Sequence, residues 1–131
     1  MNDSRSQMKP ETILFVDDEK VILETVCEIL RESGYVMLSA ADGLTACEVF
    51  DKHINEIDLV ILDLSLPKRS GADVLDYIRS KRADMKVLVC SGYVDSGQVG
   101  ELLTKGNIHF LAKPYQFEQI ITAIRVCLEG E

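Results

Sequence analysis

Five residues with complementary side chains stand at the ends of short apolar runs. Asp17 and Asp18 follow the first run, Asp63 stands at the end of the third, Ser91 follows the fourth, and Lys113 follows the fifth. If the runs are parallel strands, their carboxyl ends meet at one edge of a sheet, which would gather three carboxylates, a hydroxyl and an ammonium. Two carboxylates about 4 Å apart repel by about 4 kcal/mol at an effective dielectric constant of about 20. One lysine cannot compensate three acids, so their repulsion must be relieved by a bound cation, by protonation of a carboxylate, or by a greater distance between the carboxylates.

The residue types in this cluster favour a hard divalent cation. Oxygen ligands without clustered His or Cys are typical of Mg²⁺, with Mn²⁺ possible, and the two histidines lack the spacing of zinc ligands. Water on such an ion can be replaced by phosphate oxygens, and a lysine and a hydroxyl can bind the remaining oxygens. Taken singly, each residue also has a structural explanation, as an N-cap, a turn residue or a strand exit. Their chemical complementarity is what predicts a site for phosphoryl chemistry.

The elements that must position this cluster alternate between strand and helix. Apolar runs of strand length cover residues 13–16, 35–38, 59–62, 87–90 and 108–111. Helical spacing covers residues 20–33, 43–52, 72–82, 96–105 and 116–128. The apolar stripes expected to face the core are Ile22, Val26, Ile29 and Leu30 in the first helix, and Ile120, Ile121, Ile124 and Leu128 in the fifth. Strict alternation predicts the α/β class, with one doubly wound, five-stranded parallel sheet covered by helices on both faces.

Length and composition set the outer limits of this interpretation. A chain of 131 residues is one domain, which we expect over residues 12–131 behind a flexible polar tail at residues 1–11. The apolar runs are too short to span a membrane. The 22 acidic and 14 basic residues give a net charge of −8, so we expect no direct nucleic-acid binding. Four scattered cysteines without a C-x-x-C pair predict buried thiols in a reducing cytoplasm.

These motifs together resemble the receiver-domain family of two-component response regulators. The resemblance covers residues 12–128 and rests on four pieces in order: residues 13–19 (ILFVDDE), residues 59–67 (LVILDLSLP) with Gly71 beyond, Ser91-Gly92, and residues 110–114 (FLAKP). It implies a flavodoxin-like (βα)5 fold with strand order 2-1-3-4-5, which places the first and third strands side by side. It also implies that the Lys113–Pro114 peptide bond is often cis.

The resemblance assigns the acids their roles. Asp63 matches the phosphoacceptor, which takes a phosphoryl group from the phosphohistidine of a histidine kinase or a histidine phosphotransfer protein. Asp18 and Asp63 match the side-chain ligands of Mg²⁺, Asp17 acts mostly through water, and the backbone carbonyl of Ser65 completes the protein's share. The implied function is a phosphoaspartate signalling switch.

The remaining matched residues transmit the signal. Lys113 matches the residue that pairs with the phosphoryl group, Ser91 the hydroxyl that bonds it, and Phe110 the aromatic that turns inward when Ser91 is drawn to the phosphate. The readout face would comprise the fourth helix, fifth strand and fifth helix, and would bind an output domain or a second copy of the chain. Gly97 and Gly100 predict a marginal fourth helix, because each costs about 1 kcal/mol relative to alanine, unless they serve only to permit close packing.

The implied role is regulatory rather than enzymatic, with at most Mg²⁺-dependent self-phosphorylation and self-dephosphorylation, and two alternatives stay open. One is a haloacid-dehalogenase-like phosphatase, which also uses an aspartate nucleophile and Mg²⁺. Those enzymes carry Asp-x-Asp after the first strand, whereas this chain has Asp17-Asp18-Glu19 and no late Asp-Asp pair after Lys113. The other is a degenerate receiver that serves only for docking, although every matched side chain is present here.

Overall fold

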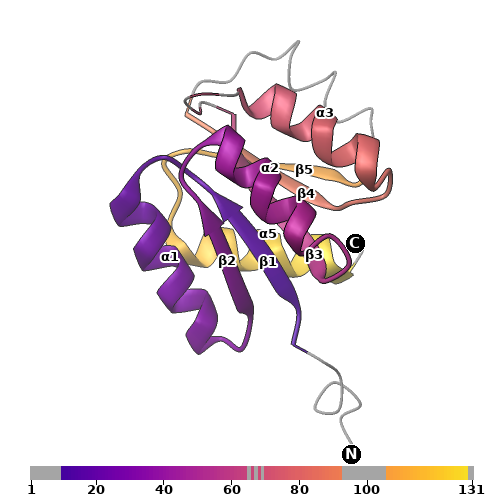
Figure 1. Ribbon diagram of the computed structural model, residues 1–131. Helices are drawn as coiled ribbons and strands as arrows, with labels where there is room; N and C mark the ends of the chain where they lie inside the picture. The colour runs from indigo at the N-terminus through magenta and orange to yellow at the C-terminus, as the bar shows by residue number, and fades with distance from the viewer. Residues whose placement is uncertain (1–9, 65, 67, 69, 93–105, 130–131) are drawn as a thin grey trace, which may run out of the picture.

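The computed structural model describes residues 10–64, 66, 68, 70–92 and 106–129 (Figure 1). Over this part of the chain there are five strands and four helices: β1 (Thr12–Val16), α1 (Lys20–Glu32), β2 (Val36–Ala40), α2 (Gly43–Lys52), β3 (Ile57–Asp63), α3 (Gly71–Lys81), β4 (Val87–Ser91), β5 (Ile108–Ala112) and α5 (Phe117–Glu129). Strands and helices alternate as predicted from β1 to β4 and from β5 to α5. The helix expected over residues 96–105 and most of the expected tail lie outside the described residues.

The strands form one parallel sheet in the order β2-β1-β3-β4-β5, which confirms the order that the resemblance implied. In the register between β1 and β3, Val16 lies opposite Leu62, so the next residues, Asp17 and Asp63, leave the two strands at the same level. Between β4 and β5, Ser91 lies opposite Ala112. The sheet therefore brings the ends of β1, β3, β4 and β5 to one edge, where the polar residues of the sequence stand.

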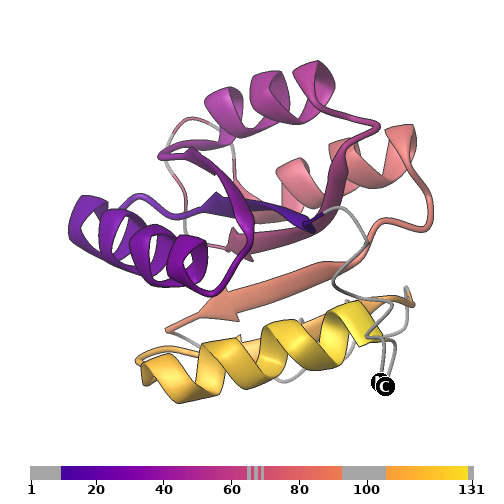
Figure 2. The ribbon, with the colours of Figure 1, turned by 90° about the horizontal axis from the view of Figure 1, so that it is seen from below.

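Helices cover both faces of the sheet, with α2 and α3 on one side and α1 and α5 on the other (Figure 2). The central strands send alternate side chains into the two layers, which explains why their sequences are apolar almost throughout. Residues that pack with α2 and α3 include Leu14, Val16, Val60 and Leu62, and those that pack with α1 and α5 include Ile13, Phe15, Leu59 and Ile61.

The buried face of α1 differs from the predicted stripe. Its buried residues are Leu23, Val26, Cys27 and Leu30, whereas Ile22 and Ile29 are only half-buried. Three consecutive apolar residues at positions 21–23 allow more than one face to dock, and packing against the sheet selects the face centred on Leu23 and Val26. In α5 the buried residues are Ile120, Ile124 and Cys127, while the predicted Ile121 and Leu128 are half-buried.

Two helices have side-chain N-caps and one does not. Asp42 accepts the backbone N–H of Thr45 at 2.7 Å at the start of α2, and Ser70 accepts that of Asp73 at 3.1 Å at the start of α3. At α1 the N-cap residue is Glu19, whose side chain makes no capping hydrogen bond. Its carboxylate is therefore free to bind elsewhere.

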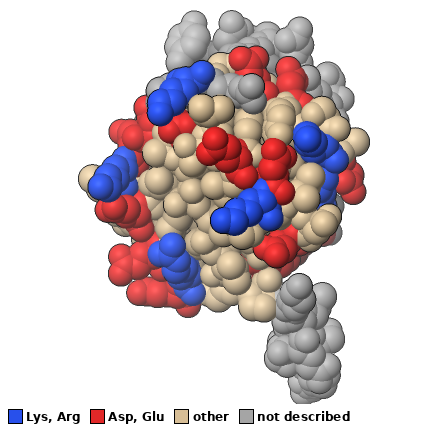
Figure 3. Space-filling view, viewed as in Figure 1, with Lys and Arg blue, Asp and Glu red and all other residues tan. Residues whose placement is uncertain are grey.

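The surface and the cysteines bear on the compositional predictions. All four cysteines are buried and none forms a disulfide, as predicted, while the cytoplasmic location stays a prediction. On the face shown in Figure 3, Lys and Arg side chains lie singly among Asp and Glu, without forming a basic stripe. In the described part of the chain, no helix combines the length and the apolar character needed to cross a membrane.

Candidate functional site

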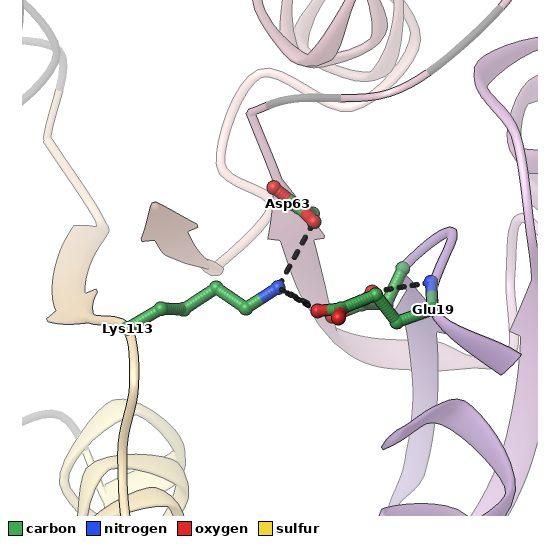
Figure 4. A network of polar contacts seen from close by, with 4 residues as sticks. Glu19, Asp63 and Lys113 are labelled. Carbon is green, nitrogen blue, oxygen red and sulfur yellow. Dashed lines mark hydrogen bonds and ion pairs between the residues drawn. The ribbon is translucent and has the colours of Figure 1, made fainter. Parts of the chain in front are cut away.

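Backbone hydrogen bonds continue the sheet into the site and fix where its side chains start. The N–H of Asp17 donates to the carbonyl of Ala40 at 3.1 Å, and the N–H of Lys113 donates to the carbonyl of Ser91 at 2.9 Å. Asp63 is itself the last residue of β3. Figure 4 shows the result: the Lys113 side chain extends from the end of β5 toward Asp63 and Glu19.

The Lys113 ammonium lies among three carboxylates. Its Nζ is 3.0 Å from Asp17 Oδ2, 3.2 Å from Asp63 Oδ2 and 3.3 Å from Glu19 Oε1 (Figure 4). The Asp17 and Asp63 side chains are 1% and 5% exposed and that of Lys113 is 14% exposed, whereas that of Glu19 is 59% exposed. Two of the three ion pairs are therefore shielded from water, and one lies at the rim.

Burial and pairing act in opposite directions on these groups. Burial raises the pKa of Asp17, although the backbone N–H of Glu19 and the Lys113 ammonium both act to lower it. Burial alone would lower the pKa of Lys113, but the hydrogen bond from its ammonium to Asp17 and the negative charges of Asp17 and Asp63 raise it. Lys113 is thus held in its charged form, next to an acid whose ionised form is less favoured than that of an exposed aspartate.

Three carboxylates form a group with the chemistry of a hard-cation site. One oxygen each from Asp17, Asp18 and Asp63 can be chosen so that all three lie within 4.8 Å of one another. Asp17 and Asp63 are buried and Asp18 is exposed, so the group opens to solvent on one side. This all-oxygen donor set suits Mg²⁺, which keeps part of its water shell when a protein binds it through a few carboxylates.

The other predicted site residues are placed as follows. Ser91 is buried at the end of β4, opposite Ala112, the residue of β5 that precedes Lys113. Phe110 is half-buried and packs in the layer of α2 and α3. The Lys113–Pro114 bond is cis, as the resemblance implied. Ser65, whose backbone carbonyl was predicted as a metal ligand, lies outside the described residues.

Two features of the site were missed at the sequence level. The first is Glu19 as a partner of Lys113, although a third consecutive acid after β1 was a visible signal. The second is a cavity of about 870 Å³ beside the acids, whose apolar lining comes from α1 and from the segment after β5: Val21, Ile22, Val26, Pro114, Tyr115 and Phe117. Val21 is 76% exposed and Phe117 46% exposed, so the cavity has an apolar rim open to solvent.

Comparisons with known proteins agree with this geometry. The family model described as "Response regulator receiver domain" matches residues 13–125. The chain is 30% identical over 120 residues to the sensor kinase CckA of Brucella abortus. The aligned residues make up 92% of this chain but only 13% of that protein. The chain is also 30% identical to the chemotaxis protein CheY of Listeria monocytogenes, over 86% of this chain and 93% of that protein.

A solved structure extends the likeness to three dimensions. The CheX–CheY–BeF3–Mg²⁺ complex from Borrelia burgdorferi matches with a TM-score of 0.84 and 26% identity, covering 92% of this chain and 90% of the matched chain. The similarity therefore extends to the backbone that carries the acidic cluster.

Proposed function

Because the chain belongs to the family of response regulator receiver domains, the regulatory modules of two-component systems, we propose that Asp63 accepts a phosphoryl group from a phosphohistidine. One observation carries the proposal. Asp63 ends β3 with an oxygen 3.2 Å from the Lys113 ammonium, within the carboxylate group of Asp17 and Asp18, and it lines the open cavity. A nucleophile, a cation and an access route therefore meet at one carboxylate.

In the proposed transfer, a carboxylate oxygen of Asp63 attacks phosphorus in line with the bond to the donor imidazole. The new O–P bond forms as the N–P bond breaks, and the bonding electron pair stays on the imidazole nitrogen. Magnesium, held by Asp18 and Asp63, by Asp17 through water and by the Ser65 carbonyl, would supply positive charge to the phosphoryl oxygens.

The residues around Asp63 would then respond to the new charge. The phosphoryl group adds a charge of about −1.5 to −2 at pH 7 to a site that is already acidic. Lys113 pairs with it, and the Ser91 hydroxyl donates a hydrogen bond to it, which draws Ser91 and then Phe110 inward. This movement alters the face that includes β5 and α5, and with it the affinity for an output domain or for a second copy of the chain.

The apolar cavity suggests where the phosphohistidine donor docks. Its rim residues Val21 and Phe117 are exposed, and the cavity reaches Asp63 at its polar end. A histidine kinase or histidine phosphotransfer protein that covers these side chains would bury apolar surface while directing its imidazole toward the carboxylate.

The acceptor is tested by incubating the purified chain with acetyl phosphate, with and without Mg²⁺, and measuring its intact mass. We expect one labile phosphoryl adduct that requires Mg²⁺, is absent from Asp63→Asn and persists in Asp58→Asn, the matched loss of charge on the same strand. A full adduct on Asp63→Asn would refute the assignment. Sustained hydrolysis of a phosphate ester would favour the phosphatase alternative, and no adduct on the wild type would favour a docking-only receiver.

The donor surface is tested by comparing two phosphoryl donors. Val21→Glu should slow transfer from a phosphorylated histidine phosphotransfer protein but not from acetyl phosphate, because only the protein donor needs the apolar rim. Leu44→Glu is the matched control, since Leu44 is 49% exposed and is not among the residues that line the cavity. Equal rates for Val21→Glu and the wild type with the protein donor would refute this surface.

A further inference from the structure

Glu19 contacts Lys113 but is absent from the residues to which the receiver resemblance assigns a role. We propose that Glu19 is a positioning residue that holds the Lys113 ammonium when a divalent cation is bound by Asp63 and, through water, by Asp17. The inference rests on the metal site of the proposed function. The question is which carboxylate still pairs with Lys113 once a cation has bound to the buried acids Asp17 and Asp63.

Lys113 has three carboxylate partners. An ammonium has three N–H donors, and Asp17, Asp63 and Glu19 each lie between 3.0 and 3.3 Å from Nζ. Asp17 and Asp63 also belong to the candidate metal group, which in the described part of the chain does not include Glu19. A cation at that group would neutralise two of the three partners and leave Glu19 as the remaining one.

The backbone of Glu19 is well suited to this task. Its N–H donates to Asp17 Oδ1 at 2.8 Å, and its carbonyl accepts the N–H of Leu23 at 2.9 Å, the first hydrogen bond of α1. An N-cap side chain usually turns back onto its own helix, but that of Glu19 makes no capping hydrogen bond and reaches Lys113 instead. Main-chain bonds therefore fix the residue while its carboxylate serves the site.

The effect of removing Glu19 should depend on whether a cation is present. Without one, Lys113 keeps two buried carboxylates, so losing the third partner changes little. With one, the cation compensates much of the negative charge of Asp17 and Asp63, so losing Glu19 removes the remaining uncompensated partner of an ammonium side chain that is only 14% exposed. Since an unpaired charge is least tolerated where water is excluded, removing Glu19 should weaken the cation-bound state selectively.

Titration calorimetry with Mg²⁺ tests this dependence. We expect Glu19→Gln to weaken Mg²⁺ binding about fivefold when Lys113 is present, and less than about twofold in a Lys113→Met background. Glu24→Gln is the matched control, because it removes the same charge from an exposed position of α1, the helix that Glu19 precedes, and it should change the affinity less than about twofold in both backgrounds.

The results that would contradict the role of Glu19 differ from the result that would contradict the metal site. An equal loss of affinity in both backgrounds would mean that Glu19 acts on the cation directly, and no loss with Lys113 present would mean that it does not hold the lysine. Either result overturns the inference and leaves the metal site intact. Absence of Mg²⁺ uptake by the wild type would refute the metal site itself.

A second measurement does not need a Lys113 variant. In protein labelled with ¹³C at lysine Cε, the Lys113 signal of the wild type should keep the line width of an ordered side chain at saturating Mg²⁺. In Glu19→Gln the same signal should narrow to that of an exposed lysine when Mg²⁺ is added. A signal that stays broad in Glu19→Gln at saturating Mg²⁺ would overturn the inference.

Discussion

Replacing Lys113 with methionine would remove the only cation seen between Asp17 and Asp63 in the described part of the chain, while retaining most of the aliphatic stem. At the observed Nζ–O distances of 3.0 and 3.2 Å, each attraction is about 5 kcal/mol at an effective dielectric constant of about 20. Much of this attraction is offset by the desolvation of the ammonium, so we expect a net loss of about 3–5 kcal/mol in unfolding free energy.

Urea unfolding in the presence of EDTA at pH 7 measures this loss. Lys20→Met is the control, because it removes the same charge from an exposed position beside the site, and it should change stability by less than about 0.5 kcal/mol. Mg²⁺ should stabilise Lys113→Met more than the wild type, since in the variant a cation replaces the missing charge between the two buried acids.

The pH dependence has a defined sign. Burial raises the pKa of Asp17, and removing Lys113 should raise it further. A carboxyl group whose folded pKa lies above its unfolded value binds more protons in the folded state, so its contribution to stability declines as the pH rises through the folded pKa. Lys113→Met should therefore regain more stability than the wild type as the pH is lowered from 7 through the raised pKa of Asp17. Two results would refute this account of the site. One is that Lys113→Met loses less than about 1 kcal/mol of unfolding free energy in EDTA. The other is that its loss of unfolding free energy changes neither when Mg²⁺ is added nor when the pH is lowered.

Three further predictions concern the surroundings of the site. In Gly71→Ala the new Cβ would lie 2.6 Å from the carbonyl oxygen of Asp63 and against Cα of Leu64, so urea unfolding should show a loss of about 3 kcal/mol, together with weaker Mg²⁺ binding because Asp63 must shift. Burial raises the pKa of Cys90 to about 12, and all four cysteines are buried. Ellman's reagent at pH 8 should therefore react slowly with the native chain and rapidly with all four thiols in guanidinium. Fast labelling without denaturant would contradict the packing. Asp42→Ala should lower the unfolding free energy by about 1 kcal/mol at pH 7 by removing the N-cap of α2, and because the backbone hydrogen bond from Thr45 lowers the pKa of Asp42, this difference should disappear as the pH falls through that lowered value.

Much of the architecture could be predicted because its signals are local. The predicted bounds of α2 match the structure at residues 43–52, where Asp42 provides an N-cap and the apolar spacing is regular. The apolar runs lie within or overlap the five strands. The signal is clearest in β1, β3 and β4, because a strand buried on both faces needs apolar residues almost throughout. The meeting of the polar residues that end these runs could also be predicted, because the carboxyl ends of parallel strands lie at the same edge of the sheet.

Other features could not be read from local patterns. The predicted buried face of α1 was right for Val26 and Leu30 but wrong for Ile22 and Ile29, because several adjacent apolar residues satisfy the helical period equally well and docking selects among them. The cavity combines side chains from α1 with Pro114, Tyr115 and Phe117, which are about 90 residues away in the sequence, and no periodicity connects the two segments.

The sequence by itself determined the kinds of groups at the strand ends and, through strict alternation, the edge of the sheet where they meet. Only the tertiary structure decided that Lys113 is shared by Asp17, Asp63 and Glu19, with two of these acids shielded from water and one at the rim. The reason is physical: charge and periodicity are properties of the chain, whereas the strength of an ion pair depends on distance and on the exclusion of water, which exist only after packing.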